Sequence, residues 1–162
     1  MCLFWHLATR CSNKRNFSYL VGKIKCGPMK EFVYHEVVKV YDTDYQGIAH
    51  YASYYRFFTD SIDAFNAKLL GKDSKELVEG NKWFVVAESE AKYRKPLKIG
   101  DNIMISVSAK ALSRKAIEYA LLIKRNPGDE TTTEGRLVLV CIDRNTFRPA
   151  DMHEGMFNLL DS

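Results

Sequence analysis

One long amphipathic segment, residues 51–70, constrains the fold of this chain more than any other stretch. Its large apolar and aromatic side chains recur at spacings of three and four residues and are Tyr51, Tyr54, Tyr55, Phe58, Ile62, Phe65 and Leu69. This spacing gives a helix one apolar stripe. Arg56, Asp60 and Asp63 fall outside the stripe, and Gly71 follows as a typical helix-ending residue. The segment therefore predicts one long helix that is buried along one side.

The segments around this helix have the composition and alternation of β-strands. The five predicted strands span residues 32–41, 83–93, 102–112, 116–125 and 131–143. A polar connector with one turn near Leu77, capped by Ser74, precedes the second strand, and residues 152–160 predict a short terminal helix. A helix followed by a run of antiparallel strands is an α+β pattern, in which the sheet buries one face on the helix.

Two carboxylates, Asp42 and Asp44, lie between the first strand and the helix, and Gly47 follows them at a position free to take a positive φ. A tight turn at this point places an acidic side chain near the helix N-terminus, where unpaired N–H groups and the helix dipole stabilise negative charge. Asp also favours Asx turns and helix starts. We assign that structural role to Asp42. Because Gly47 and several more residues separate Asp44 from the helix start, we assign Asp44 a catalytic role.

Two stretches carry a resemblance to a known family. The first reads Asp42-Thr43-Asp44-x-x-Gly47-Ile48, continues as Tyr51-Ala52-Ser53-Tyr54 and ends in Phe57-Phe58, and the second reads Tyr93-Arg94-x-Pro96-x-x-x-Gly100-Asp101. In both, the chain resembles the 4-hydroxybenzoyl-CoA thioesterases and YbgC-like acyl-CoA thioesterases, over roughly residues 32–147. The resemblance implies one hotdog domain, here residues 29–162, in which a five-stranded antiparallel sheet wraps one long central helix.

The resemblance also implies an activity, the hydrolysis of an acyl-CoA to a free acid and CoA. It places the catalytic carboxylate at Asp44, which would attack the thioester carbonyl or activate a water molecule, and both routes stay open. Backbone N–H groups near His50 and Tyr51 would hold the oxyanion, and Gly47 would permit close approach. The His50 side chain would assist proton transfer or only stack at an interface. Cations on predicted turns that could bind the CoA phosphates are Arg94, Lys95, Arg114 and Lys115.

The same residues are compatible with three alternative functions. An acyl-ACP thioesterase of the same fold and a hotdog module that binds acyl-CoA without hydrolysing it are two alternatives. A calcium loop is a third, because residues 42, 44, 46 and 47 match its positions 1, 3, 5 and 6. That match fails at position 12, which is Ser53 rather than Glu, and the preceding segment is strand-like. We expect no metal and no cofactor apart from the CoA of the substrate.

The first 28 residues differ in composition from the rest of the chain. They contain five basic residues and no Asp or Glu, whereas the remaining residues carry 19 basic and 20 acidic side chains. The near-neutral body argues against a nucleic-acid partner. The acid-free segment reads either as a mitochondrial or plastid transit peptide or as an upstream extension before a natural start at Met29. We otherwise expect a cytoplasmic protein.

The positions of the cysteines and the lengths of the apolar runs argue against a disulfide-linked or cysteine-bound metal protein and against a membrane span. Three of the four cysteines lie in the first 28 residues, so no disulfide framework or metal spacing is present, and Cys141 is predicted to be a small buried apolar residue. No apolar run approaches the ~20 residues that a membrane span needs. Members of the family bury their sheet edges by association, so the resemblance implies a homodimer or homotetramer.

Overall fold

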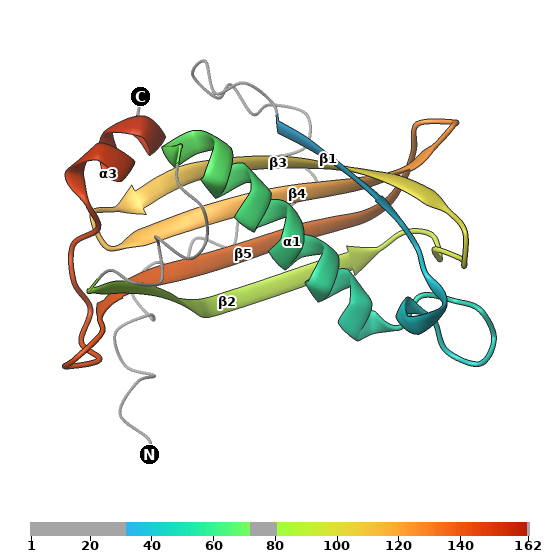
Figure 1. Cartoon of the computed structure of the whole chain (residues 1–162), viewed down its shortest axis with the longest axis horizontal. Helices are drawn as coiled ribbons and strands as arrows, with labels where there is room; N and C mark the ends of the chain where they lie inside the picture. The colour runs from blue at the N-terminus through green and yellow to red at the C-terminus, as the bar shows by residue number, and fades with distance from the viewer. Residues whose placement is uncertain (1–31, 72–80, 162) are drawn as a thin grey trace.

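The computed structural model describes residues 32–71 and 81–161, which form a five-stranded antiparallel sheet around a long helix (Figure 1). The strands are β1 (Phe32–Val37), β2 (Lys82–Tyr93), β3 (Asn102–Ser113), β4 (Ala116–Asn126) and β5 (Glu130–Asp143). Their order in the sheet is β1-β3-β4-β5-β2, and every neighbouring pair is antiparallel. The predicted α+β hotdog architecture is confirmed.

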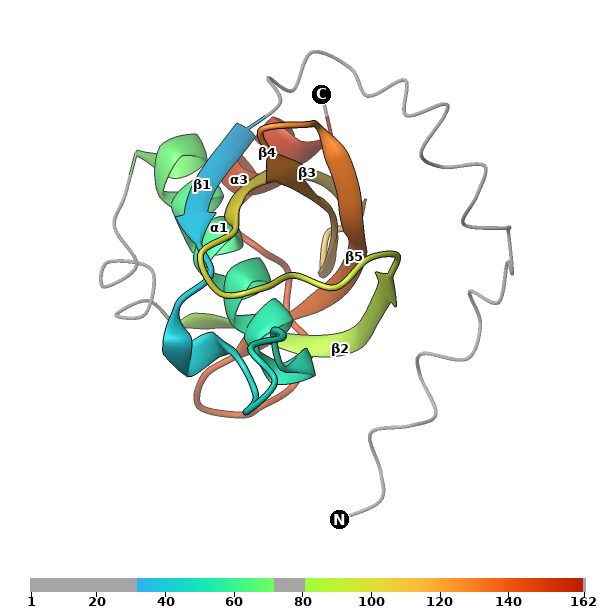
Figure 2. The ribbon, with the colours of Figure 1, turned by 90° about the vertical axis from the view of Figure 1, so that its right-hand side faces the viewer.

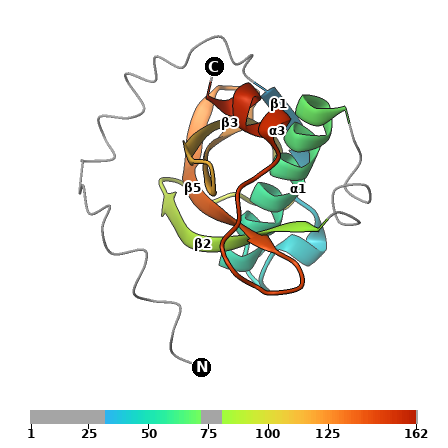
Figure 3. The ribbon, with the colours of Figure 1, turned by 90° about the vertical axis from the view of Figure 1, so that its left-hand side faces the viewer.

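Helix α1 (Tyr51–Leu70) lies across the concave face of the sheet. Figures 2 and 3 look at the molecule from its two ends and show the sheet curling around this helix. The buried apolar residues of α1 are Tyr54, Phe57, Phe58, Ile62 and Phe65. Gly71 ends the helix with a φ of 64°, as predicted. Tyr51 departs from the predicted stripe, because it lies in the first turn and 65% of it is exposed.

The contact between α1 and the sheet depends on a glycine. Gly135 of β5 pairs with Ala91 of β2 and Leu121 of β4. A Cβ atom at Gly135 would lie only 2.5 Å from Cζ of Phe58, which is fully buried. The absent side chain therefore lets the helix approach the sheet closely.

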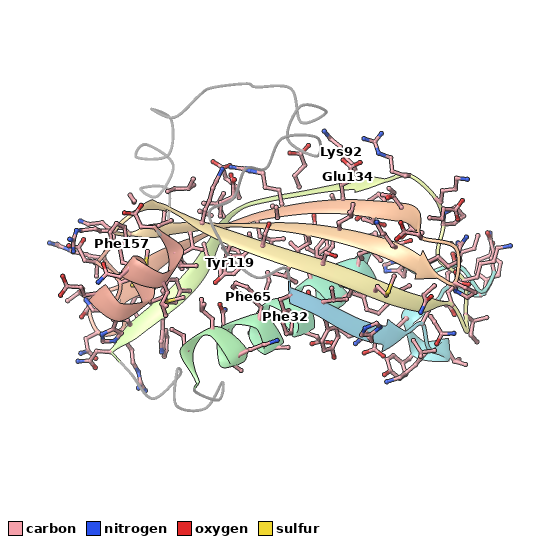
Figure 4. All side chains as sticks on the ribbon, turned by 90° about the horizontal axis from the view of Figure 1, so that it is seen from above. Phe32, Phe65, Lys92, Tyr119, Glu134 and Phe157 are labelled. Atoms are coloured by element: carbon pink, nitrogen blue, oxygen red, sulfur yellow. The ribbon has the colours of Figure 1, made fainter. Side chains whose placement is uncertain are left out.

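A group of aromatic rings packs the C-terminal half of α1 against the sheet. The ring centroid of Phe65 lies 5.9 Å from that of Phe32 and 6.2 Å from that of Tyr119, in edge-to-face arrangements (Figure 4). The buried Tyr119 hydroxyl donates a 3.0 Å hydrogen bond to Oδ1 of Asn66. Burial raises the pKa of Tyr119 to about 12, although the bond to Asn66 opposes this shift.

The first strand is shorter than predicted, since β1 ends at Val37 and not at Tyr41. Val37 pairs with Asn102, the first residue of β3, so β1 has no partner beyond that point. The chain then bends into the short 3₁₀ helix η2 (Val40–Asp42). Strand composition alone cannot show where the neighbouring strand begins.

Of the remaining local predictions, some are confirmed and others fall on residues that the structure does not describe. Cys141 is fully buried, and a terminal helix, α3 (Glu154–Leu160), forms where it was predicted. The predicted turn at Ser74 and Leu77 and the extension at residues 1–28 lie outside the described residues. Within the described ranges, no helix is long and apolar enough to cross a membrane.

Candidate active site

Asp44 lies on a tight loop that connects η2 to α1. The loop is closed by backbone hydrogen bonds from Asp44 N–H to the Ile48 carbonyl (2.9 Å) and from Gly47 N–H to the Asp44 carbonyl (3.0 Å). Gly47 has a φ of 74°, which the loop requires and glycine adopts readily. The Asp44 Oδ1 atom accepts the N–H groups of Gln46 (2.8 Å) and Ile48 (3.2 Å). Asp44 is therefore a turn-forming residue, a role that the sequence assigned only to Asp42.

The second carboxylate oxygen of Asp44 is different. Oδ2 accepts no hydrogen bond from any residue in the described part of the chain, and the Asp44 side chain is partly exposed. One oxygen thus holds the loop in shape, and the other is available to a substrate or a water molecule.

The start of α1 supplies a backbone donor beside this loop. The N–H of His50 is engaged, because it donates to the Asp42 carbonyl at 2.8 Å. The His50 side chain is the N-cap, and its Nδ1 accepts the N–H of Ala52 at 3.3 Å. The N–H of Tyr51 has no acceptor among residues 32–71 and 81–161. Of the two predicted oxyanion donors, only Tyr51 therefore has a free N–H group, and His50 has a capping role that its residue type did not signal.

A surface hollow of about 360 Å³ adjoins the helix start, and it is lined by Ile48, Ala49, Tyr51, Tyr54, Tyr93, Arg94, Lys95 and Pro96. The rings of Tyr54 and Tyr93 meet edge-to-face with centroids 4.8 Å apart. The Tyr54 hydroxyl accepts the Leu97 N–H at 3.2 Å, which fixes the ring. The hollow is therefore mainly aromatic and apolar, with two cations at its margin.

The four predicted phosphate-binding cations do not lie together. Arg94 and Lys95 line the hollow, where Arg94 contacts Glu134 at 3.2 Å and Lys95 contacts Glu130 at 2.6 Å. Arg114 and Lys115 form the β3–β4 turn, at the end of β3 that lies farthest from the Asp44 loop (Figure 1).

The length of β3 separates the two pairs of cations by roughly 35 Å. Arg114 stacks over Phe157 with 5.0 Å between its guanidinium carbon and the ring centroid. Figure 4 shows Phe157 and Glu134, the partner of Arg94, well apart along the sheet. Within one chain, the structure brings only Arg94 and Lys95 to the hollow.

Sequence reasoning missed an ion pair beneath the Asp44 loop. Asp42 is only 1% exposed, and its carboxylate accepts Nε and Nη2 of Arg56, both at 3.0 Å, and the N–H of Lys39 at 2.9 Å. The last bond is the turn role predicted for Asp42. Burial alone would lower the pKa of Arg56, but hydrogen bonds and charge interactions with Asp42 and Asp60 raise it.

This pairing also bears on the calcium alternative. Both oxygens of Asp42 are engaged by protein donors and are not free to bind a cation. In the described ranges, no group of three or more His, Cys, Asp or Glu side chains could hold a metal ion. Asp42 and Arg56 are 14 residues apart, a spacing with no periodic signal, so their contact was not predictable.

The fold is similar to that of several solved structures, two of which are CoA thioesterases. The structure superposes on the 1,4-dihydroxy-2-naphthoyl-CoA thioesterase of Synechocystis with a TM-score of 0.75 and 13% identity, covering 81% of this chain and 96% of that one. A gentisyl-coenzyme A thioesterase gives a TM-score of 0.71 and 23% identity, with 80% and 99% covered. A Staphylococcus aureus protein in complex with CoA gives 0.73 and 18%, with 80% and 81% covered. At these identities, the likeness shows the fold.

The sequence itself matches a family profile over most of its length. The profile of the thioesterase-like superfamily matches residues 38–160, which include the Asp44 loop and every described helix and strand except β1. A protein of Aquifex aeolicus (strain VF5) with a provisional esterase name is 26% identical over 92 residues, which are 57% of this chain and 71% of that protein. The chain belongs to the thioesterase-like superfamily.

Proposed function

We propose that the protein is an acyl-CoA thioesterase that uses Asp44 to hydrolyse the thioester to a free acid and CoA. One observation carries the proposal: Asp44 has a free carboxylate oxygen on the loop that leads to an unpaired helix N-terminal amide. Asp44 is hydrogen-bonded to Ile48, and Ile48 and Tyr51 both line the aromatic hollow. An acid, an oxyanion donor and an apolar recess are what thioester hydrolysis needs.

Asp44 can act by either of two catalytic mechanisms. As a general base, it takes a proton from water while the hydroxide adds to the thioester carbonyl carbon. The N–H of Tyr51 then donates a hydrogen bond to the oxyanion. Collapse of the tetrahedral intermediate expels the CoA thiolate, which takes the proton from Asp44. As a nucleophile, Asp44 displaces the CoA thiolate to form an acyl-aspartyl anhydride. Water then cleaves this anhydride to the free acid and protonated Asp44, and the proton of Asp44 passes to the thiolate.

The other proposed roles follow from position. Arg94 and Lys95 would bind the CoA phosphates at the margin of the hollow, after exchanging their present carboxylate partners. Arg114 and Lys115 can reach the same site only from another subunit. A raised KM for acyl-CoA in the Arg114→Ala/Lys115→Ala variant would therefore indicate a site shared between subunits. An unchanged KM would remove these two residues from CoA binding.

The test of the function is thiol release from short, long and aromatic acyl-CoAs and from acyl-ACP, measured on the full chain and on its Asp44→Asn variant. We expect turnover by the parent and a loss of at least ~10²-fold in kcat in the variant. Preference for acyl-ACP would favour the carrier-protein alternative. Acyl-CoA binding without thiol release from any donor would contradict the enzyme proposal and identify a binding module.

We also propose a homodimer formed through β2, or a homotetramer made of two such dimers. β2 is an edge strand of 12 residues, and its neighbour in the described sheet is β5 alone. Val86 is 58% and Tyr93 is 48% exposed on it. A long sheet edge with unpaired backbone groups and exposed apolar side chains is a template for pairing with another chain. Light scattering that finds a monomer at micromolar concentration would contradict this assembly.

A further inference from the structure

We propose that Arg56 is a positioning residue for the reaction, because it holds the buried Asp42 carboxylate and thereby fixes the loop that carries Asp44. The inference rests on the proposed function of Asp44. Arg56 itself lies on the polar side of α1, and no part of it lines the aromatic hollow.

The first link runs from Asp42 to both ends of the Asp44 loop. The Asp42 carbonyl accepts two hydrogen bonds of 2.8 Å, one from the N–H of His50 and one from Oγ of the buried Ser53. Residue 42 precedes the loop, and residues 50 and 53 begin the helix that follows it. A displacement of Asp42 therefore moves the entry and the exit of the loop together.

The second link runs from Arg56 to Asp42. The guanidinium meets the two carboxylate oxygens with two nitrogens, an arrangement that fixes direction as well as distance. Without Arg56, the buried Asp42 carboxylate would keep only the N–H of Lys39 as a donor. A buried charge left in that state is strongly unfavourable, so the side chain would turn toward water and carry its backbone with it.

The remaining contacts of Arg56 indicate that it serves the loop and not the substrate. Nη1 contacts Asp60 at 2.7 Å and Glu36 at 3.5 Å, so all three guanidinium nitrogens face carboxylates. The guanidinium also stacks over Phe57, with 4.5 Å from its central carbon to the ring centroid. Each of the three guanidinium nitrogens of Arg56 already contacts a carboxylate, which favours a structural role over the binding of a phosphate or a carbonyl.

The test compares Arg56→Gln with Arg136→Gln in the full chain. Arg136 is a matched control, because it also contacts two carboxylates, Glu118 at 2.7 Å and Glu88 at 2.8 Å. It follows Gly135, which faces α1, so it points to the opposite face of the sheet. We expect Arg56→Gln to lower kcat about 10- to 100-fold with KM changed less than about threefold, as for residues that orient a functional group through another side chain. Arg136→Gln should leave kcat unchanged.

Three further measurements separate positioning from a loss of folding. Assays are run well below the Tm of each variant, with the folded fraction checked by circular dichroism. Arg56→Lys keeps the charge but loses the two-nitrogen contact with the Asp42 carboxylate, so its kcat should lie between those of the parent and Arg56→Gln. Hydrogen exchange at the amides of Gln46 and Ile48 should accelerate in Arg56→Gln and not in Arg136→Gln, because these amides bond to Asp44.

The outcomes distinguish this inference from the proposed function. A normal kcat in Arg56→Gln overturns the inference, whereas the proposed function stands if Asp44→Asn is inactive. A raised KM with normal kcat would also overturn it and assign Arg56 to substrate binding. If Asp44→Asn keeps full activity, or if the parent releases no thiol, the proposed function fails and the inference falls with it.

Discussion

Replacement of Gly135 by Ala should destabilise the protein, although Ala usually improves a strand position. The new Cβ would lie 2.5, 2.8 and 2.9 Å from three atoms of the Phe58 ring, where ordinary contacts begin at 3.4 Å. The ring must therefore move by about 1 Å within a fully buried site, and overpacking of this kind costs about 1–3 kcal/mol. We expect a net loss of about 2 kcal/mol in the free energy of unfolding, or a fall in Tm of about 4–8 °C.

The assay is thermal and denaturant unfolding at fixed protein concentration, because assembly would make Tm concentration-dependent. Gly155→Ala is the control, since no atom lies within 4 Å of its added Cβ, and it should be neutral or slightly stabilising. In a Phe58→Leu background, Gly135→Ala should lower the free energy of unfolding by less, because the phenyl ring that overlaps the new Cβ is absent. An unchanged or higher Tm for Gly135→Ala in the parent would refute the close-approach argument.

Two further predictions concern pH. Burial alone would raise the pKa of Glu118, but Lys110 and Arg136, each 2.7 Å away, lower it. Its stabilising effect is therefore present above the unfolded pKa of about 4.3 and lost as pH falls through the folded value. The Tm difference between the parent and Glu118→Gln should shrink from pH 7 to pH 3, and a constant difference would contradict this. Burial raises the pKa of Tyr119 from its ordinary value of 10.0 to about 12 in the folded protein, so the folded state should lose stability as the pH rises from 10 to about 12. Phenolate absorbance should show a step near pH 12 that is absent from Tyr119→Phe, and its persistence there would assign the step to another tyrosine.

Much of the fold was predictable because its signals are local. The apolar stripe and Gly71 set the helix, and turn residues separated the strands, as the structure confirms. The likeness of the Asp44 motif to a known family added the hotdog topology, which strand composition alone does not specify. The role of Asp44 in catalysis stays a prediction.

By itself, the sequence determined the kind and order of the elements and the residues eligible for chemistry, because periodicity and turn preference act between neighbours along the chain. Tertiary structure decided which residues meet. The pairing of Asp42 with Arg56 and the fit of Phe58 over Gly135 join segments that the chain does not place side by side. The end of β1 at Val37 depends on where β3 begins. Each of these contacts has a partner that only the folded chain supplies, and a local pattern carries no information about it.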